Sequence, residues 1–182
     1  NHGRAVAHFA KVLNCEAVIF IPRGVSQTAV DAIRSEGATV NILDTSYDNA
    51  VEAARGAALD NQWLLVQDTS WPGYEEIPQT IVDGYSTMLV EVQEQLKAEG
   101  ITRPDVVLVP TGVGSLLQAA LEFYNTESQS TKVVAVEAEA AACMKISLET
   151  GTPVTVETGV TVMAGLNCGT PSTLAWPAIQ NA

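Results

Sequence analysis

The sequence predicts an α/β protein made of two units, each built on parallel β-strands. Short runs that are apolar throughout, such as residues 106–109, are typical of parallel strands covered on both faces. These runs alternate with segments of helical periodicity, as in βαβ units. A late strand also ends in a glycine turn that opens a helix. Apolar residues make up 47 % and charged residues 16 % of the 182 residues, a globular composition.

The first predicted element is a helix that begins near His2. Four apolar residues follow the spacing i, i+3, i+4, i+7 and form one apolar stripe of this helix: Val6, Phe9, Ala10 and Leu13. The rest of the first unit, which ends at residue 66, is expected to alternate strand and helix. Ser26 is the expected N-cap of the second helix, which Gly37 ends. The expected elements are strands at 17–21, 39–43 and 63–66 and helices at 26–37 and 47–59.

A Pro- and Gly-containing stretch marks a change of unit, and we place the boundary so that the second unit covers residues 67–182. It is expected to hold part of a larger parallel sheet. The predicted elements are helices at 78–99, 115–124 and 140–149, strands at 105–109 and 132–136, and weak strands at 154–156 and 160–163.

The glycine turn at Gly112, Val113, Gly114 and Ser115 carries the sharpest chemical signal. A strand that ends there and opens a helix collects free backbone N–H groups, and the helix dipole adds partial positive charge. Glycines allow an anion to approach the backbone closely, and Ser115 offers a hydroxyl donor. The turn therefore predicts a phosphate site, against the alternative of a tight connection without a ligand.

A nicotinamide-type dinucleotide site is a competing interpretation of this turn. It requires G-x-G-x-x-G followed by an acidic residue about twenty positions on. Leu117 stands at the third glycine position, although Glu137 is suitably placed after the next strand. One glycine of the motif is missing, so this interpretation is the weaker of the two.

Charge and cysteine content exclude other classes of function. The net charge of −12 repels phosphate backbones and anionic lipid, so neither nucleic acid nor a membrane is an expected partner. The three cysteines show no CxxC pair, and no metal site is expected. They are interpreted as free thiols in a reducing cytoplasm.

Three segments resemble the fold type II pyridoxal-phosphate (PLP) enzymes, which share the tryptophan synthase beta-like fold, and among them the diaminopropionate ammonia-lyases. The resemblance runs over essentially all 182 residues in the same order. It rests on Asn-His-Gly-Arg-Ala-Val-Ala at 1–7, Gln-Asp-Thr-Ser-Trp with Gly-Tyr at 67–74, and Met-Ala-Gly-Leu-Asn-Cys-Gly at 163–169, together with the glycine turn.

The resemblance implies the cofactor PLP and a role for each matching residue. Asn1 would hydrogen-bond the ring hydroxyl of the cofactor, and residues 112–115 would hold its phosphate. Asp68 would be the active-site carboxylate near the α-carbon of a small amino-acid substrate. Trp71 and Tyr74 would lie on the adjoining loop, and residues 163–166 near the cofactor ring. The implied reaction releases ammonia from 2,3-diaminopropionate and leaves pyruvate, in a cytoplasmic homodimer.

Each of these residues also has a structural interpretation. Asn1 is a plausible helix cap, and Asp68 a turn carboxylate at a strand end. Trp71 and Tyr74 suit packing at the junction of the units.

The sequence departs from the family pattern in one decisive feature. Fold type II enzymes hold PLP as a Schiff base on a lysine that precedes the Asn-His-Gly segment, and none of the four lysines matches that position: Lys11, Lys97, Lys132 and Lys145. Thr170 and Ser172 stand where the lyases show Gly-Glu-Pro-Asn. We therefore expect an internal fragment of a larger protein, inactive by itself. The alternatives are a remnant that works as a binding or assembly module, and another fold type II dehydratase or racemase.

Overall fold

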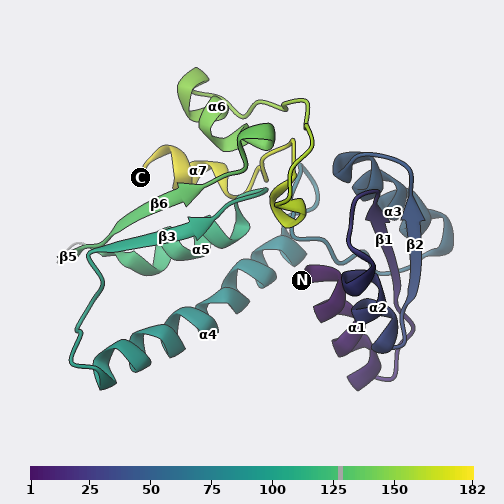
Figure 1. Cartoon of the computed structure of the whole chain (residues 1–182), viewed down its shortest axis with the longest axis horizontal. Coiled ribbons are helices and arrows are strands. Elements are labelled where there is room, and N and C mark those ends of the chain that lie inside the picture. Colours follow the sequence, from purple (N-terminus) through teal and green to yellow (C-terminus); the bar gives the residue numbers. More distant parts are fainter. Residues whose placement is uncertain (127–128) are drawn as a thin grey trace. The chain divides into compact units, whose positions relative to one another are not determined.

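The computed structural model describes residues 1–126 and 129–182, which form two compact units, Asn1–Val66 and Gln67–Ala182. Each unit contains a parallel pair of strands flanked by helices (Figure 1). The predicted α/β fold class with parallel strands is therefore confirmed.

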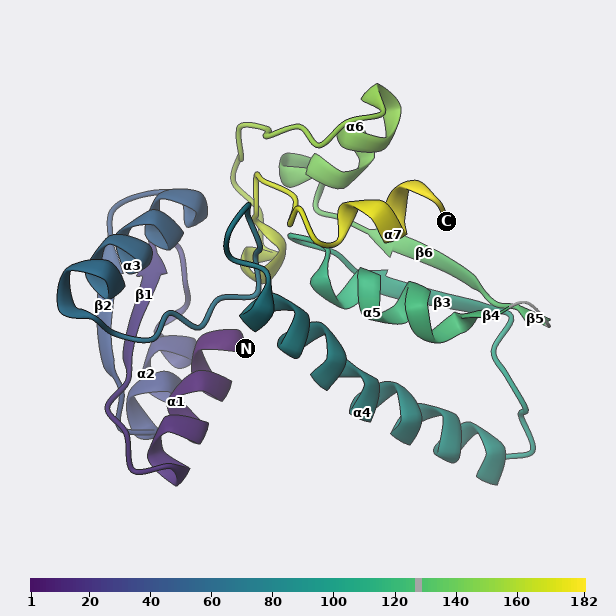
Figure 2. The same cartoon turned by 180° about the vertical axis from the view of Figure 1, so that it is seen from behind.

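Unit 1 is built around strands β1 and β2, which pair in parallel from Val18 opposite Thr39 to Pro22 opposite Leu43. Helices α2 and α3 cover opposite faces of this sheet (Figures 1 and 2). The side chain of Ser26 accepts the N–H of Ala29, so the predicted N-cap of α2 is confirmed. The elements are α1 (His2–Val12), β1 (Val18–Pro22), α2 (Gln27–Ser35), β2 (Thr39–Leu43) and α3 (Tyr47–Asn61).

The predicted apolar stripe of α1 is buried only in part, because Val6 packs against the core of unit 1 but Phe9 and Leu13 do not. Phe9 and Leu13 are 62 % and 71 % exposed, whereas Ala7 is 1 % exposed and belongs to the core. The cause is close packing of the helix on the sheet, because a Cβ added to Gly3 would lie 2.9 Å from Cγ2 of Ile19. Small residues permit this approach, whereas Phe9 and Leu13 are left on the exposed side of the helix.

The predicted third strand at residues 63–66 is also wrong, so the sheet of unit 1 has two strands. Trp63 and Leu64 are 50 % and 77 % exposed, and the segment joins no ladder among the described residues. Its end is held instead by the ring Nε2 of His2, which lies 3.0 Å from the carbonyl oxygen of Val66. An apolar run forms a strand only where a neighbouring strand edge is available to it.

Unit 2 contains the parallel pair β3 and β6, in register from Val106 opposite Lys132 to Pro110 opposite Val136. A short antiparallel pair, β4 and β5, was not predicted from the sequence. The elements are α4 (Glu76–Ala98), β3 (Val106–Pro110), α5 (Ser115–Tyr124), β4 (Asn125–Thr126), β5 (Gln129–Ser130), β6 (Lys132–Val136), α6 (Cys143–Thr150) and α7 (Trp176–Gln180), with 3₁₀ turns η1 (Glu139–Ala141) and η2 (Ala164–Leu166).

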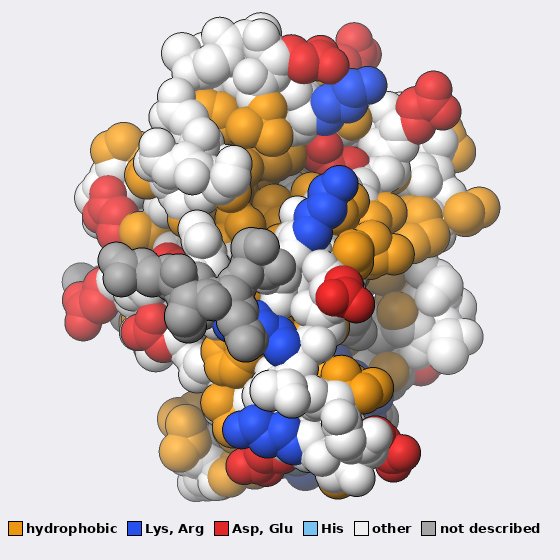
Figure 3. Space-filling model, turned by 90° about the vertical axis from the view of Figure 1, so that its left-hand side faces the viewer, with side chains coloured by type: hydrophobic (Ala, Val, Ile, Leu, Met, Phe, Trp, Pro, Cys, Tyr) orange, Lys and Arg blue, Asp and Glu red, His pale blue; other side chains and the backbone are white. Residues whose placement is uncertain are grey.

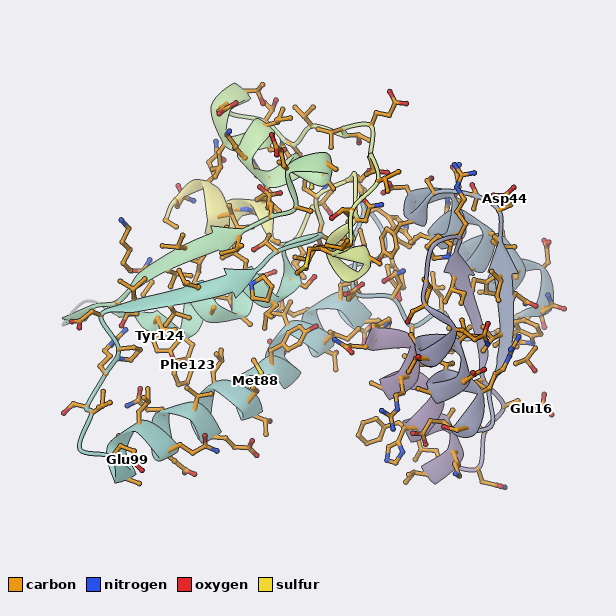
Figure 4. The ribbon with its side chains drawn as sticks, viewed as in Figure 1. Glu16, Asp44, Met88, Glu99, Phe123 and Tyr124 are labelled. Carbon is orange, nitrogen blue, oxygen red and sulfur yellow. The ribbon has the colours of Figure 1, made fainter. Side chains whose placement is uncertain are left out.

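Helix α5 forms the centre of the core of unit 2. Seven of its ten residues are buried, and its Leu117 and Tyr124 pack with residues of α4, α6 and α7 in one cluster. Phe123 projects from α5 toward α4 (Figure 4). Hydrophobic side chains are also visible at the surface, between the charged side chains (Figure 3). Leu108 of β3, for example, is 66 % exposed.

Two further predictions for unit 2 need correction. The helix expected at 140–149 begins as a 3₁₀ turn at Glu139–Ala141 and becomes α-helical only at Cys143. The weak strands expected at 154–156 and 160–163 are not strands, and Val160 and Val162 are almost fully exposed. The Val156 N–H donates to the Gly169 carbonyl at 2.9 Å, but neither segment pairs with a strand among the described residues, and β-branched residues alone do not make a ladder. In the part of the chain that is described, no helix is long and apolar enough to cross a membrane.

Candidate functional site

The glycine turn joins the end of β3 to the start of α5. Gly114 is the N-cap of α5 and has a φ of 105° and a ψ of −6°, a left-handed conformation that favours glycine. No acidic side chain stands in the first turn of the helix. The N-terminal end of α5 therefore keeps the partial positive charge of its helix dipole.

Every carbonyl along the turn from Gly112 to Gly114 faces a donor of the chain. The Gly112 carbonyl lies 3.8 Å from the thiol sulfur of Cys143. The Val113 carbonyl accepts the N–H of Ser172 at 2.8 Å, and the Gly114 carbonyl accepts the N–H of Gln118 at 2.8 Å.

These carbonyls fix the direction of the N–H groups. All peptide bonds of the described residues are trans, so each N–H points away from the carbonyl of the preceding residue. Within residues 1–126 and 129–182, the N–H groups of residues 112–115 donate to no acceptor of the chain. Several unpaired donors at a helix N-terminus are the geometry that binds phosphate groups.

The space behind the turn is filled by side chains from distant segments. A Cβ at Gly112 would lie 3.1 Å from Sγ of Cys168, and a Cβ at Gly114 would lie 2.7 Å from Cε of Met144. Ala175 and Ile179 would each have an atom 3.2 Å from the Gly114 Cβ. Side chains from distant segments therefore pack closely against the Cβ positions of both glycines.

Asp68 lies beside this turn, although 47 residues separate it from Ser115. The Ser115 hydroxyl donates to the backbone carbonyl of Asp68 at 2.6 Å. The hydroxyl proton is thus used within the chain, and the donor that Ser115 has available for an anion is its N–H group. The backbone of Asp68 and the sequence-predicted turn are therefore directly hydrogen-bonded in the structure.

Two phenol groups stand within the electrostatic reach of Asp68. Burial raises the pKa of Tyr85, and the negative charge of Asp68 raises it further. Burial raises the pKa of Tyr74, a hydrogen bond with the backbone of Gln67 lowers it, and the charge of Asp68 raises it again. Tyr85, on α4, was not among the residues predicted from the sequence, because its helix position resembles that of any core aromatic.

The loop that carries Trp71 and Tyr74 is ordered by contacts between them. Their rings stack with centroids 4.5 Å apart, and the Tyr74 N–H donates to the Trp71 carbonyl at 2.8 Å. The Tyr74 hydroxyl accepts the N–H of Gln67 at 2.9 Å. These bonds hold the residue that directly precedes Asp68.

The segment at 163–168 lies against the turn. The Cα of Leu166 is 3.7 Å from the Cβ position of Gly112. Among the described residues, two buried polar atoms in the segments next to the turn have no hydrogen-bond partner, Oγ1 of Thr69 and Oδ1 of Asn167. Buried polar atoms are almost always satisfied, so these two indicate unused hydrogen-bonding capacity beside the site.

Asn1 and the lysines are described by their own surroundings. Asn1 belongs to unit 1, where it is the N-cap of α1 without a side-chain cap bond; its assignment to the cofactor rests on the resemblance alone. Lys132 begins β6, at the end of the sheet away from the turn. The amine of Lys145 is 3.9 Å from the carboxylate of Glu149.

The dinucleotide interpretation is wrong for this turn. It requires Glu137 to face a ribose, but both carboxylate oxygens of Glu137 accept backbone N–H groups, those of Met144 and Lys145, each at 2.8 Å. Burial raises the pKa of Glu137, and these two hydrogen bonds oppose the shift. The carboxylate serves as a cap for α6.

Comparisons with known proteins agree with this geometry. A family model described as pyridoxal-phosphate-dependent enzyme matches residues 1–182. The diaminopropionate ammonia-lyases of Salmonella typhimurium and Escherichia coli K12 are each 39 % identical over 187 and 184 residues, which is all of this chain and 46 % of each relative. The chain thus spans about half the length of these relatives.

Solved structures give the same relationship. The Escherichia coli diaminopropionate ammonia-lyase in complex with D-serine superposes with a TM-score of 0.89 at 38 % identity, over 99 % of this chain and 45 % of that one. The processed threonine deaminase isoform 2 of Solanum lycopersicum has a TM-score of 0.79 at 26 % identity, over 99 % of this chain and 49 % of that one. The chain belongs to the family of pyridoxal-phosphate-dependent enzymes.

Proposed function

We propose that this chain is part of a PLP-dependent ammonia-lyase that acts on a small amino acid such as 2,3-diaminopropionate and yields pyruvate and ammonia. The observation that carries the proposal is the set of N–H groups of residues 113–115, which point away from the occupied carbonyls of residues 112–114 at a helix N-terminus. This arrangement fits the phosphate of PLP, because a dianion gains from several backbone donors and the helix dipole together.

The residues present fit the rest of the cofactor in the same way. Leu166 lies against Gly112, and residues 163–166 are proposed, from the resemblance, to lie near the cofactor ring. The unpartnered Oγ1 of Thr69 offers hydrogen bonding beside Asp68. Asn1 is proposed to contact the ring hydroxyl.

PLP supplies an electron sink that acidifies the α-proton of a bound amino acid. Asp68 is proposed to hold or accept a proton near that carbon. Its backbone is fixed to the turn through Ser115, so the distance between the carboxylate and the phosphate anchor is restrained. Trp71 and Tyr74 are proposed to shield this carboxylate from water.

The test is release of pyruvate and ammonia from 2,3-diaminopropionate by the purified natural protein that contains these residues. Serine and threonine as parallel substrates separate this lyase from a dehydratase. We expect Asp68→Asn to lower kcat by about 10²- to 10⁴-fold, the usual effect of losing a general acid or base. Turnover that is unchanged in Asp68→Asn would contradict the role given to this carboxylate, and no turnover of any amino acid would favour the binding-module alternative.

The 182 residues by themselves are proposed to be inactive. None of their four lysines occupies the position that the family uses to hold PLP covalently. Treatment with PLP and borohydride, followed by mass spectrometry, should give scattered adducts without turnover. One stoichiometric adduct together with pyruvate release would overturn this part of the proposal.

A further inference from the structure

A cluster of buried hydroxyl groups connects the glycine turn to the Asp68 loop. Ser70 and Ser172 are 2 % and 1 % exposed and lie 102 residues apart in the sequence. We infer that Ser172 is a positioning residue that fixes the turn and Asp68 relative to each other. The inference rests on the phosphate site proposed above and extends it to a residue that touches neither phosphate nor substrate.

Ser172 bonds to both sides of the site. Its N–H donates to the Val113 carbonyl at 2.8 Å. Its Oγ accepts the N–H of Ser70 at 3.0 Å, and the two hydroxyl oxygens are 2.9 Å apart. One small residue therefore holds the backbone of the turn with its own backbone and the backbone of the Asp68 loop with its side chain.

The bond to Val113 sets the direction of a donor. The Val113 carbonyl and the Gly114 N–H belong to one trans peptide and point in opposite directions. Because Ser172 holds the carbonyl, the Gly114 N–H is turned away from Ser172 and toward the anion. A rotation of this peptide that turned the Gly114 N–H away from the anion would break the hydrogen bond between Ser172 and the Val113 carbonyl.

The contacts close into a ring. From Ser172 the path runs through Val113 to Ser115, through the Ser115 hydroxyl to the Asp68 carbonyl at 2.6 Å, and through Ser70 back to Ser172. A closed ring of short hydrogen bonds leaves neither the turn nor the loop free to shift alone. Removing the Ser172 hydroxyl opens the ring and leaves the buried Ser70 N–H without its acceptor.

Ser70 supports the ring from outside. Its hydroxyl oxygen accepts the N–H of Leu174 at 2.7 Å and lies 3.0 Å from Oγ1 of Thr173. The Ser70→Ala variant loses these bonds, yet it keeps the N–H that reaches Ser172. It therefore removes an equally buried hydroxyl without breaking the ring itself.

The experiment measures inorganic phosphate binding to the chain by ¹H–¹⁵N spectroscopy, which follows the Gly114 amide directly. We expect Ser172→Ala to weaken phosphate binding about three- to tenfold, the value of one hydrogen bond, and to reduce the phosphate-dependent shift of the Gly114 amide. Ser172→Cys keeps most of the volume but offers only a weak sulfur acceptor, and it should behave like Ser172→Ala. Ser172→Thr keeps the hydroxyl and should bind phosphate like the wild type.

Two controls separate positioning from stability. Ser70→Ala should lose stability but keep most of its phosphate affinity. Thr131→Val removes a buried hydroxyl that bonds Arg103 and the Pro104 carbonyl at the other end of the sheet, and it should leave phosphate binding unchanged.

Wild-type affinity in both Ser172→Ala and Ser172→Cys, with stability lowered as in Thr131→Val, would refute the positioning role and leave the phosphate site intact. If Ser172→Ala does not fold, Ser172→Cys and Ser172→Thr still decide the question. A wild-type chain whose Gly114 amide does not respond to phosphate would overturn the phosphate site and this inference with it.

Discussion

Substitution of Gly114 by alanine tests the structure of the glycine turn most directly. Its φ of 105° lies in the left-handed region, where a Cβ meets the backbone. The added methyl would also lie 2.7 Å from Cε of Met144 and 3.2 Å from atoms of Ala175 and Ile179. All three neighbours lie behind the turn, in the core of unit 2, and the methyl would not intrude on an anion in front of it.

The expected cost has two parts. A non-glycine residue in a left-handed conformation costs about 1–2 kcal/mol. Forcing a methyl into a filled core costs about 1–3 kcal/mol. We therefore expect Gly114→Ala to lower the free energy of unfolding by about 2–5 kcal/mol.

Gly151→Ala is the matched control. Gly151 has a φ of 77°, and nothing lies within 4 Å of its Cβ position. Only the backbone cost of about 1–2 kcal/mol applies there. The difference between the two variants, measured by urea unfolding, isolates the crowding behind the turn.

The variant also separates packing from ligand binding. The Gly114→Ala turn keeps all its N–H groups, so phosphate affinity should fall only because the turn is displaced. Equal destabilisation of Gly114→Ala and Gly151→Ala would refute the close packing of Met144 on the turn. Unchanged phosphate affinity in a strongly destabilised Gly114→Ala chain would refute the claim that this packing sets the donor geometry.

Three further predictions concern stability. Ser26→Ala should cost about 1 kcal/mol through loss of the N-cap bond, measured by urea unfolding against Ser35→Ala, whose exposed hydroxyl donates to the Ala32 carbonyl of the same helix; equal costs would contradict the cap. The folded-state pKa of Glu137 is raised by burial above the ordinary carboxyl value of 4.5, so its contribution to stability is greatest below pH 4.5 and falls as pH rises through the raised pKa. The difference in stability between wild type and Glu137→Gln should therefore decrease from pH 4 to pH 7, and a rising difference would contradict the burial effect. The hydrogen bond with His8 lowers the pKa of Glu36, so its stabilisation is present above 4.5 and is lost as pH falls through the lowered pKa. The advantage of wild type over Glu36→Gln should shrink in acid and in high salt, and an advantage independent of pH would contradict the ion pair.

The elements that local signals specify were predictable from the sequence. The strand at Thr39–Leu43 begins and ends as predicted, and Ser26 caps α2 as expected. Both signals lie within a few residues of the structure that they produce. A continuous apolar run between turn residues, or a hydroxyl three residues before a free N–H, needs no distant partner to be recognised.

The incorrect predictions share one cause: each of these structures depends on contact with a distant part of the chain. Residues 63–66 have strand composition, but among the described residues they pair with no strand. In α1 the position of the buried face is decided by the close contact of Gly3 with Ile19. A pattern of hydrophobic residues does not mark this face, because glycine does not count as hydrophobic in it. Helix periodicity identifies the helix, but the partner surface decides which face is buried.

In the candidate site, too, local sequence signals predict one part and contacts with distant residues decide the other. The Gly-Val-Gly-Ser turn is a local motif, and its capacity to bind an anion follows from backbone geometry that the sequence makes plain. The direction of its donors is a different matter, because Cys143 and Ser172 hold the carbonyls that orient them. Neither residue carries a sequence signal for this task, since any segment with a donor at the right place would serve. A glycine motif therefore predicts where an anion can bind, whereas segments 30 to 60 residues further along the chain determine whether the N–H groups face it.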